Sequence, residues 1–313
     1  MQARFGCLVL LALVFALLGC GCSAGGDEPN PVGTPERSAA SNTAEVARTS
    51  EQVDIGGRSL LLECWGERAA EESTVLLIAG QGPTTSSWAP LATAFAAGGH
   101  HVCAYDRAGV GGSDAAPEAT RTLADQVTDL EALLDAATLQ EPVILAAHSL
   151  GSLPVVGLVA RAPERVAGVV LLAPWSPRVT AIQQAALPPE QPDESPAVAK
   201  ERDDLDRVLD PAQNSEHLSV TASDAEAAGL LDQPGPIFGD IPVIVLREPL
   251  PPPLAGLPDS YHTAMLAAYT AGAEEFADES TRGILIEVED TGHNIQDDQP
   301  DIVMDAIRDV MAG

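Results

Sequence analysis

The sequence predicts an α/β fold in which a mostly parallel sheet is flanked by helices. Short apolar runs of strand length alternate along the chain with longer segments of helical periodicity, and this alternation is typical of a parallel sheet. The run at 74–79 is apolar after its first residue, as expected for a strand that helices cover on both faces. Hydrophobic residues make up 45% of the 313-residue chain, so a large core can form.

The expected strands are mostly apolar runs bounded by glycine, proline or polar residues. They lie at 58–66, 74–79, 100–105, 142–148, 166–173, 242–247 and 283–289. The expected helices repeat apolar or small residues at helical spacing, and some end before glycine. They lie at 88–98, 123–137, 151–159, 259–271 and 300–311. In the last helix we expect the core-facing residues to be Ile302, Val303, Ala306, Ile307 and Val310.

The series of strands is interrupted between residues 175 and 236. This interval is rich in proline and acidic residues and has no strong strand pattern. We expect a helical lid insertion here, with its helices at 197–209 and 222–231.

The amino-terminal residues, 1–19, have the features of an export signal. Arg4 precedes an apolar run that is shorter than a comfortable membrane span. The run ends in Leu17-Leu18-Gly19-Cys20, which resembles a bacterial lipoprotein signal, where cleavage before the cysteine is followed by its lipidation. We therefore expect Cys20 to carry lipid and to anchor the protein to the cell membrane on its extracytoplasmic side. An ordinary cleaved signal that ends near Ser23-Ala24-Gly25 is the alternative.

Residues 20–50 are rich in small and polar residues and show no hydrophobic period. This composition predicts a flexible tether, which leaves 51–313 as the folded domain.

The chain is strongly acidic, with a net charge of −30 and a single lysine. It therefore offers no basic patch that could neutralise phosphates, which argues against nucleic-acid binding. The acidity instead favours solubility.

Two cysteines remain in the expected domain, Cys64 and Cys103. In an oxidising compartment such a pair readily forms a disulfide, and two separate buried thiols are the alternative. Two cysteines alone cannot supply the four ligands of a usual structural zinc site, and no metal is expected.

The stretch 143–151 has the pattern of a nucleophile elbow. An apolar strand ends abruptly at Ser149, and a small-residue segment that is compatible with a helix follows. Such a strained turn exposes a serine hydroxyl at the carboxyl end of a strand, just before a helix N-terminus. The usual pattern is Gly-x-Ser-x-Gly; Ala147 replaces its first glycine, and Gly151 matches its second. The alternative is a buried strand followed by a turn in which Ser149 caps the helix.

Several motifs occur in an order that resembles the α/β-hydrolase superfamily across residues 55–312. The segment 79–83 stands where the family has its oxyanion loop. Residues 105–113 read Tyr-Asp-Arg-Ala-Gly-Val-Gly-Gly-Ser, similar to the family's Tyr-Asp-Arg-x-Gly-x-Gly-x-Ser turn. The elbow follows, and Thr291-Gly292-His293 comes after the last expected strand. The resemblance implies an eight-stranded, mostly parallel sheet with a helical lid insertion.

The resemblance also implies roles for individual residues. Ser149 would be the nucleophile, and His293 would be the base that activates it and later the general acid. The backbone N–H groups of Gln81 and Leu150 would form the oxyanion hole. His148, although adjacent to Ser149, is expected to point elsewhere.

Other residues receive a structural role from the resemblance. Asp106 and Arg107 would fix the turn beside the oxyanion loop. In the family's sheet order the strands that carry Cys64 and Cys103 are neighbours, which brings the two cysteines within disulfide range.

The third member of the triad departs from the family pattern, which usually places an Asp soon after the strand at 242–247. That loop here begins with Glu248 and continues with a run of prolines and one leucine. Glu248 is the nearest carboxylate and our first choice, and Asp259 is the second. An acid matters because it orients the histidine and stabilises its positive charge.

The leading hypothesis is an exported, lipid-anchored serine hydrolase that cleaves an ester-like bond of a small molecule through an acyl-enzyme intermediate. A serine nucleophile argues against the haloalkane dehalogenase and epoxide hydrolase branches of the family, which use Asp. Esters, thioesters, amides and lactones remain open, and no metal or organic cofactor is required. The alternative, favoured by the unusual acid, is a non-catalytic hydrolase-fold lipoprotein that binds a ligand or partner. A solute-binding lipoprotein would explain the anchor but not the elbow.

Overall fold

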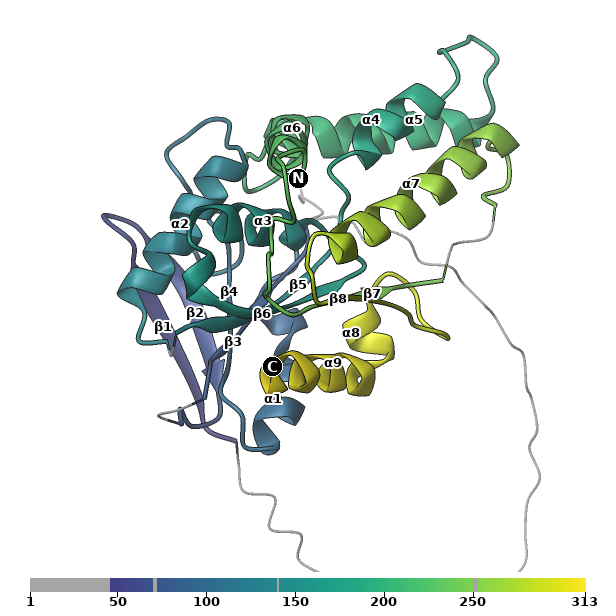
Figure 1. Cartoon of the computed structure of the whole chain (residues 1–313). Helices are drawn as coiled ribbons and strands as arrows, with labels where there is room; N and C mark the ends of the chain where they lie inside the picture. Colours follow the sequence, from purple (N-terminus) through teal and green to yellow (C-terminus); the bar gives the residue numbers. More distant parts are fainter. Residues whose placement is uncertain (1–45, 70–71, 140, 250–252) are drawn as a thin grey trace, which may run out of the picture. The chain divides into compact units, whose positions relative to one another are not determined.

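The computed structural model describes residues 46–313, apart from 70–71, 140 and 250–252 (Figure 1). The expected signal sequence, the lipidation site at Cys20 and nearly all of the expected tether lie outside the described residues. None of the helices in the described part of the chain is long and apolar enough to cross a membrane.

The described residues contain one eight-stranded sheet, in the order β1-β2-β4-β3-β5-β6-β7-β8. Strand β2 runs antiparallel to both of its neighbours, and every other neighbouring pair is parallel. This confirms the predicted mostly parallel sheet. The strands are β1 (Arg48–Asp54), β2 (Ser59–Trp65), β3 (Val75–Ile78), β4 (Val102–Tyr105), β5 (Val143–His148), β6 (Val166–Leu172), β7 (Val243–Arg247) and β8 (Gly283–Glu287).

Strand β1 was not predicted. Its residues are polar except for Val53, which is also the only one of them that is buried, so the strand carries no alternating apolar pattern. It forms the edge of the sheet and pairs along its whole length with β2. The boundary expected between the tether and the domain, at residue 50, therefore falls inside this strand.

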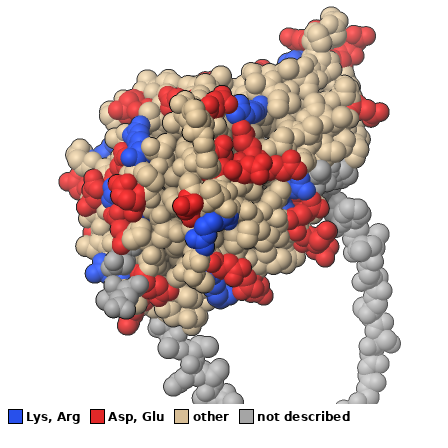
Figure 2. Space-filling model, viewed as in Figure 1, with Lys and Arg blue, Asp and Glu red and all other residues tan. Residues whose placement is uncertain are grey.

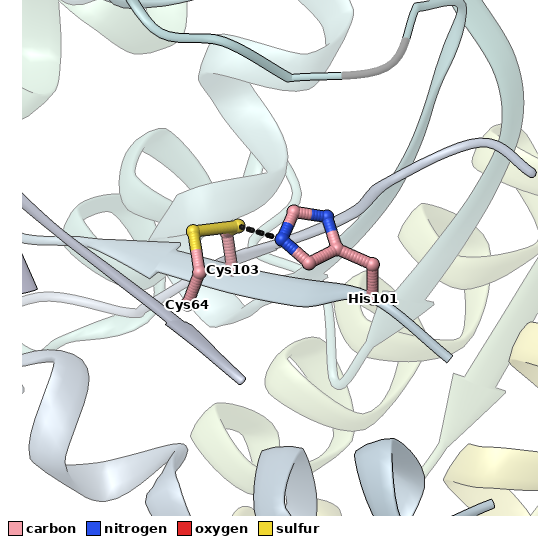
Figure 3. A group of neighbouring side chains, drawn as sticks. All are labelled: Cys64, His101 and Cys103. Atoms are coloured by element: carbon pink, nitrogen blue, oxygen red, sulfur yellow. Dashed lines mark hydrogen bonds between the residues drawn. A yellow bond between two sulfur atoms is a disulfide. The ribbon is translucent and has the colours of Figure 1, made fainter. Parts of the chain in front are cut away.

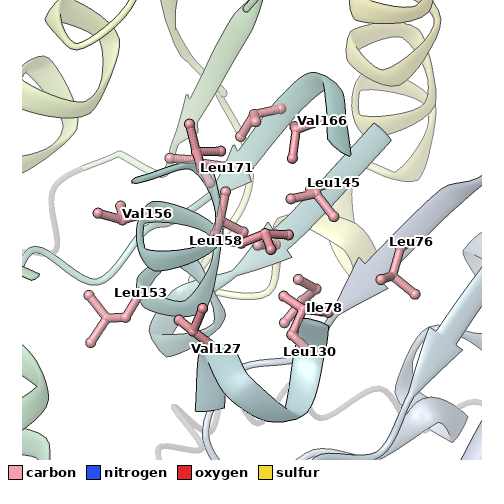
Figure 4. Packing of buried hydrophobic residues seen from close by; sticks show 14 of the residues in the cluster. Leu76, Ile78, Val127, Leu130, Leu145, Leu153, Val156, Leu158, Val166 and Leu171 are labelled. Atoms are coloured by element: carbon pink, nitrogen blue, oxygen red, sulfur yellow. The ribbon is translucent and has the colours of Figure 1, made fainter. Parts of the chain in front are cut away.

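Helices cover both faces of the sheet (Figure 1). Alternate residues of β3 enter two separate apolar clusters: Leu76 and Ile78 contact one, and Val75 and Leu77 contact the other. Helices α2 and α3 pack on the first side (Figure 4), with α6 against them, and α1 and α9 pack on the second. These helices are α1 (Ala89–Ala97), α2 (Leu123–Ala136), α3 (Ser152–Arg161), α6 (Val220–Leu231) and α9 (Pro300–Ala312).

One residue of α9 differs from its predicted place. Val303, Ala306, Ile307 and Val310 are buried as expected, but Ile302 is 36% exposed. The apolar stripe of α9 is wider than the surface that the sheet covers, so Ile302 lies at its solvent-exposed margin.

The insertion is helical, as predicted, but it contains one helix more than expected within the described residues. Helix α5 (Pro196–Leu209) and helix α6 match the prediction, whereas α4 (Val179–Ala186) was missed because it is short. Helices α4 and α5 share an apolar cluster with the first half of α7 (Asp259–Asp278), and the second half of α7 packs on the sheet core. The shorter elements are η1 (Thr85–Ser87), η2 (Ser149–Gly151), η3 (Pro163–Arg165), η4 (Pro211–Gln213) and α8 (Ile295–Asp298).

Cys64 and Cys103 lie directly opposite each other on β2 and β4 and are joined by a disulfide (Figure 3). His101 lies beside them, with Nε2 at 3.8 Å from Cys103 Sγ. The two sulfurs and this imidazole are close enough to share a metal ion. In the disulfide, however, neither sulfur is a thiolate, and thiolate is the form that binds metals. We therefore assign this group no metal.

Acidic side chains are spread over the surface rather than gathered into one patch on the face that Figure 2 shows. Basic side chains lie among them in smaller number, in keeping with 46 acidic and 16 basic residues in the chain.

Candidate active site

Ser149 stands at the carboxyl end of β5 with a φ of 51°, in the left-handed region that non-glycine residues rarely adopt. The chain continues directly into η2 and α3. A Cβ at Gly151 would lie 2.6 Å from the carbonyl oxygen of Ala79 and 2.8 Å from that of Ile78, so only glycine fits where the turn passes β3. Strand, strained turn and helix thus follow one another as in a nucleophile elbow.

Ala147 occupies the position where the usual elbow has glycine. It lies between Ile78 of β3 and Leu171 of β6 in the sheet and is fully buried. Its methyl group belongs to the apolar cluster on the α2 and α3 side, so the sheet core accommodates the departure from the usual motif.

Ser149, His293 and Glu248 lie together in a chain of hydrogen bonds. Ser149 Oγ is 3.0 Å from His293 Nε2, and His293 Nδ1 is 3.0 Å from Glu248 Oε1. A carboxylate only accepts hydrogen bonds, so the imidazole carries its proton on Nδ1 and leaves Nε2 free to accept the serine proton. The three residues come from the loops after β5, β7 and β8, whose carboxyl ends share one edge of the sheet.

Asp259, the second choice for the acid, lies elsewhere. It is the first residue of α7 and its side chain is exposed. Within the described residues, Glu248 is the carboxylate that is hydrogen-bonded to His293. The side chain of Glu248 is 22% exposed and that of His293 is 54% exposed, so solvent reaches the outer part of this chain of hydrogen bonds.

The expectation that His148 points away from the site was wrong. Its ring lies 4.7 Å from that of His293, centroid to centroid, and its Nε2–H donates to the His293 carbonyl oxygen at 2.8 Å. Burial, together with the nearby His293, lowers the pKa of His148 to about 4. A neutral His148 therefore holds the backbone of His293, a contact that requires the folded loop after β8 and that local sequence does not reveal.

The expected oxyanion loop passes close to the nucleophile. A Cβ at Gly80 would lie 3.1 Å from Ser149 Cβ and 3.0 Å from His148 Nδ1, so glycine lets the backbone approach here. Gln81 follows directly, and Leu150, the other expected donor, is buried at the first turn after Ser149. Both backbone N–H groups thus belong to segments that border the serine.

Asp106 and Arg107 tie this loop to the following turn, which is the structural role the resemblance implied. Asp106 accepts the backbone N–H groups of Thr85 at 2.6 Å and Gly112 at 2.8 Å. Arg107 donates to the carbonyl oxygens of Ala79 and Gly80.

The insertion also contacts the site. The backbone N–H of Trp175 donates to the Ser149 carbonyl oxygen at 3.1 Å, and its indole donates to Asp224 of α6 at 2.9 Å. Thr180 of α4 donates to the same carboxylate. Burial raises the pKa of Asp224 to about 6, against the lowering effect of these hydrogen bonds.

The family model described as "Serine aminopeptidase, S33" matches residues 69–189. This segment contains the expected oxyanion loop and Ser149 but neither Glu248 nor His293. A protein of Variovorax paradoxus named "Putative carbamate hydrolase RutD" is 39% identical over 107 residues, which is 34% of this chain and 40% of that protein. The match thus spans well under two thirds of that relative's length.

Solved structures extend the similarity to nearly the whole described chain. A 2-hydroxy-6-oxo-6-phenylhexa-2,4-dienoate hydrolase from Rhodococcus aligns with a TM-score of 0.57 at 16% identity, over 86% of this chain and 100% of its own. An enol-lactonase from Burkholderia xenovorans aligns with a TM-score of 0.53 at 20% identity, over 85% of this chain and 100% of its own. The chain has the α/β-hydrolase fold. At these identities the likeness concerns the hydrolase fold alone, and function has to be argued from the site.

Proposed function

We propose that this protein is a serine hydrolase that cleaves an ester-like bond of a small molecule, with Ser149, His293 and Glu248 as its triad. The observation that carries the proposal is the chain of two 3.0 Å hydrogen bonds that begins at a serine in the left-handed region on an elbow turn. A serine that merely capped a helix would need neither partner.

In the proposed acylation step, His293 Nε2 removes the proton of Ser149 Oγ as this oxygen attacks the substrate carbonyl carbon. Glu248 stabilises the imidazolium that forms. The N–H groups of Gln81 and Leu150 stabilise the negative oxygen of the tetrahedral intermediate. His293 then gives the proton to the leaving group, and the acyl group remains on Ser149.

In the proposed deacylation step, a water molecule takes the place of the leaving group. His293 removes a proton from this water, which attacks the acyl carbon, and the same residue returns the proton to Ser149 Oγ as the acid product leaves. The half-exposed ring of His293 gives this water a path from solvent.

The names of similar proteins support a class of substrate. The names refer to carbamate hydrolysis in one curated relative and to an enol-lactone in one structural neighbour. A carbamate and a lactone both present an acyl carbon that bears a leaving group, which is the centre that an activated serine attacks. We therefore propose an ester, lactone or carbamate substrate.

We further propose that the protein is exported and anchored through lipid on Cys20. Support comes from the sequence Leu17-Leu18-Gly19-Cys20, and the disulfide between Cys64 and Cys103 is compatible with an oxidising compartment. The Cys20→Ala variant should be released from membranes, whereas the native protein should carry a lipid-modified amino terminus by mass spectrometry. A variant that stays on the membrane, together with an unmodified native protein, would contradict the anchor.

Pre-steady-state hydrolysis of short-chain nitrophenyl esters tests the proposed chemistry. An acyl-enzyme predicts an initial burst of nitrophenol that approaches one equivalent per protein when deacylation is slower than acylation. Turnover that persists in Ser149→Ala would contradict the mechanism. If the native protein shows no turnover across an ester, lactone and carbamate panel, the non-catalytic ligand-binding alternative becomes the better account.

A further inference from the structure

The insertion reaches the oxyanion loop through a buried ion pair. Glu216 lies in the segment between η4 and α6, and it is 3% exposed; its partner Arg107 is 5% exposed. Arg107 Nε donates to Glu216 Oε2 at 2.7 Å, and Nη2 donates to Oε1 at 2.7 Å. The pair is therefore bidentate, which fixes the plane of the guanidinium as well as its position.

The same guanidinium holds a peptide unit of the oxyanion loop. Arg107 Nη2 also donates to the Gly80 carbonyl oxygen at 2.7 Å, and Nη1 donates to that of Ala79. The Gly80 carbonyl and the Gln81 N–H belong to one planar trans peptide, in which the two groups point in opposite directions. Fixing the Gly80 oxygen therefore also sets the direction of the Gln81 N–H.

We propose that Glu216 is a positioning residue for the oxyanion hole, which acts through Arg107 on the peptide between Gly80 and Gln81. The inference rests on the proposed function, because it assigns the Gln81 N–H to the intermediate's negative oxygen. It adds that the insertion, through Glu216, takes part in aligning this donor.

Asp106 is the nearest other carboxylate along the chain, but it cannot replace Glu216. Its two oxygens already accept N–H groups from Thr85 and Gly112. Without Glu216 the guanidinium would be a buried charge with no hydrogen-bonded carboxylate, which is strongly unfavourable. It would shift toward water or another acceptor, and the Gly80 carbonyl would lose its fixed donor.

The segment that carries Glu216 is itself held tightly. Gln126 of α2 donates to Glu216 at 3.1 Å. The backbone of Arg121 exchanges hydrogen bonds with the segment on both sides of Leu218, accepting from Ser219 and donating to His217, each at 2.8 Å. A Cβ at Gly109 would collide with the carbonyl oxygen of Ser215. The insertion is thus docked closely on the turn at 106–113, where its Glu216 holds the Arg107 guanidinium.

Steady-state kinetics of Glu216→Gln tests the inference. Removing one oxyanion donor typically lowers kcat by about 100- to 1,000-fold, so a misdirected donor should lower it by about 10- to 100-fold. KM should stay within about twofold, because the donor contacts the intermediate more strongly than the substrate. Glu216→Asp keeps the charge at a shorter reach and should recover part of the lost kcat.

Glu141→Gln is the matched control. Glu141 forms a bidentate pair of the same geometry with Arg165, with both N–O distances at 2.7 Å, near the amino ends of β5 and β6. This pair is more exposed, and Arg165 also contacts Asp135. Both Gln variants should lower the thermal midpoint, but at temperatures below both midpoints Glu141→Gln should keep native kcat. If Glu216→Gln does not fold, Glu216→Asp still has to show a reduced kcat at native KM.

The outcomes separate this inference from the proposed function. A native protein that turns over while Glu216→Gln and Glu216→Asp keep its kcat within twofold overturns the positioning role and leaves the hydrolase proposal standing. An equal fall of kcat in Glu141→Gln would show a general effect of lost stability and would also overturn the role. A native protein without turnover would remove both proposals.

Discussion

The nucleophile elbow and the insertion meet at Ser149, but different forces hold them there. The elbow is placed by apolar packing: every residue of β5 is buried, and Gly151 lies in van der Waals contact with the backbone of β3. The insertion packs on α2 and α3 through apolar residues of α6, but it meets the active-site loops through polar contacts, of Glu216 with Arg107 and of the Trp175 N–H with the Ser149 carbonyl oxygen. The position of the elbow should therefore resist the loss of a single charge, whereas the contacts of the insertion with the site should respond to it.

The largest expected effect is on catalysis, and it comes from removing the His293 side chain. His293→Ala should lower kcat by about 10⁴- to 10⁶-fold, because the proposed mechanism uses this residue as both base and acid. The free energy of unfolding should change little, because the imidazole is more than half exposed. Ester turnover and urea unfolding of the same preparation measure the two quantities. A large loss of stability would mean that His293 also helps to build the elbow.

The next effect concerns the acid on the loop after β7. Glu248→Gln should lower kcat by about 100-fold or more, because the imidazolium loses its charge partner and the preferred tautomer. Asp259→Asn, an exposed change at the start of α7, should keep native turnover. If Asp259→Asn loses activity while Glu248→Gln keeps it, the assignment of the acid is wrong.

The disulfide joins β2 and β4, which belong to the sheet and not to the insertion. It closes a loop with a sequence separation of 39 residues, so the chain-entropy model gives about 3–4 kcal/mol of stabilisation. The Cys64→Ser/Cys103→Ser double variant should unfold at lower urea concentration by that amount and should keep native kcat where it is folded. Free thiols at both Cys64 and Cys103 in the unfolded, unreduced native protein would exclude the bridge.

The smallest effect compares the pH dependence of the two regions. The pKa of His148 is lowered to about 4 in the folded protein, so as pH falls the unfolded chain binds this proton first. The contribution of His148 to the free energy of unfolding is therefore lost as pH falls from about 6.5 to 4. The pKa of Asp224 is raised to about 6 in the folded protein, so the folded state keeps this proton to higher pH than the unfolded chain. The contribution of Asp224 to the free energy of unfolding is therefore lost as pH rises from about 4 to 6. Each group changes the free energy of unfolding by on the order of 3 kcal/mol. Because the two changes have opposite signs over nearly the same pH range, they largely cancel.

Asp224→Asn should remove the contribution of Asp224 and leave that of His148. The unfolding free energy of the variant should then rise with pH between 4 and 6, relative to the native protein, by up to about 3 kcal/mol. Urea unfolding at half-unit pH steps measures the difference. Parallel pH profiles for the two proteins would mean that Asp224 does not titrate in this range.

The parts that could be predicted from the sequence are those that local pattern encodes. Buried strands such as β3 and β5 are continuous apolar runs, and the elbow motif marks the carboxyl end of β5. Strand β1 was missed because an edge strand with only Val53 buried has no such pattern. Helix α4 was missed because a short amphipathic segment in a proline-rich interval carries too few repeats.

The contacts around the site that escaped prediction all join residues far apart in the chain. Glu216 meets Arg107 across 109 positions, and His148 meets His293 across 145. Neither the charge of Glu216 nor the type of its neighbours distinguishes it from the many other acidic residues of the insertion. Such pairings depend on the folded backbone, so they become visible only when the sheet and the insertion are placed together.

Labelling with a fluorophosphonate, mapped by peptide mass spectrometry, tests the central claim that Ser149 is activated by His293. The reagent phosphonylates a serine only when a base removes its proton and the site stabilises the negative oxygen that develops. The account predicts one phosphonyl group per protein, on Ser149, and a loss of labelling in His293→Ala that is still folded. A folded native protein that stays unlabelled, or that is labelled on another serine, would contradict it.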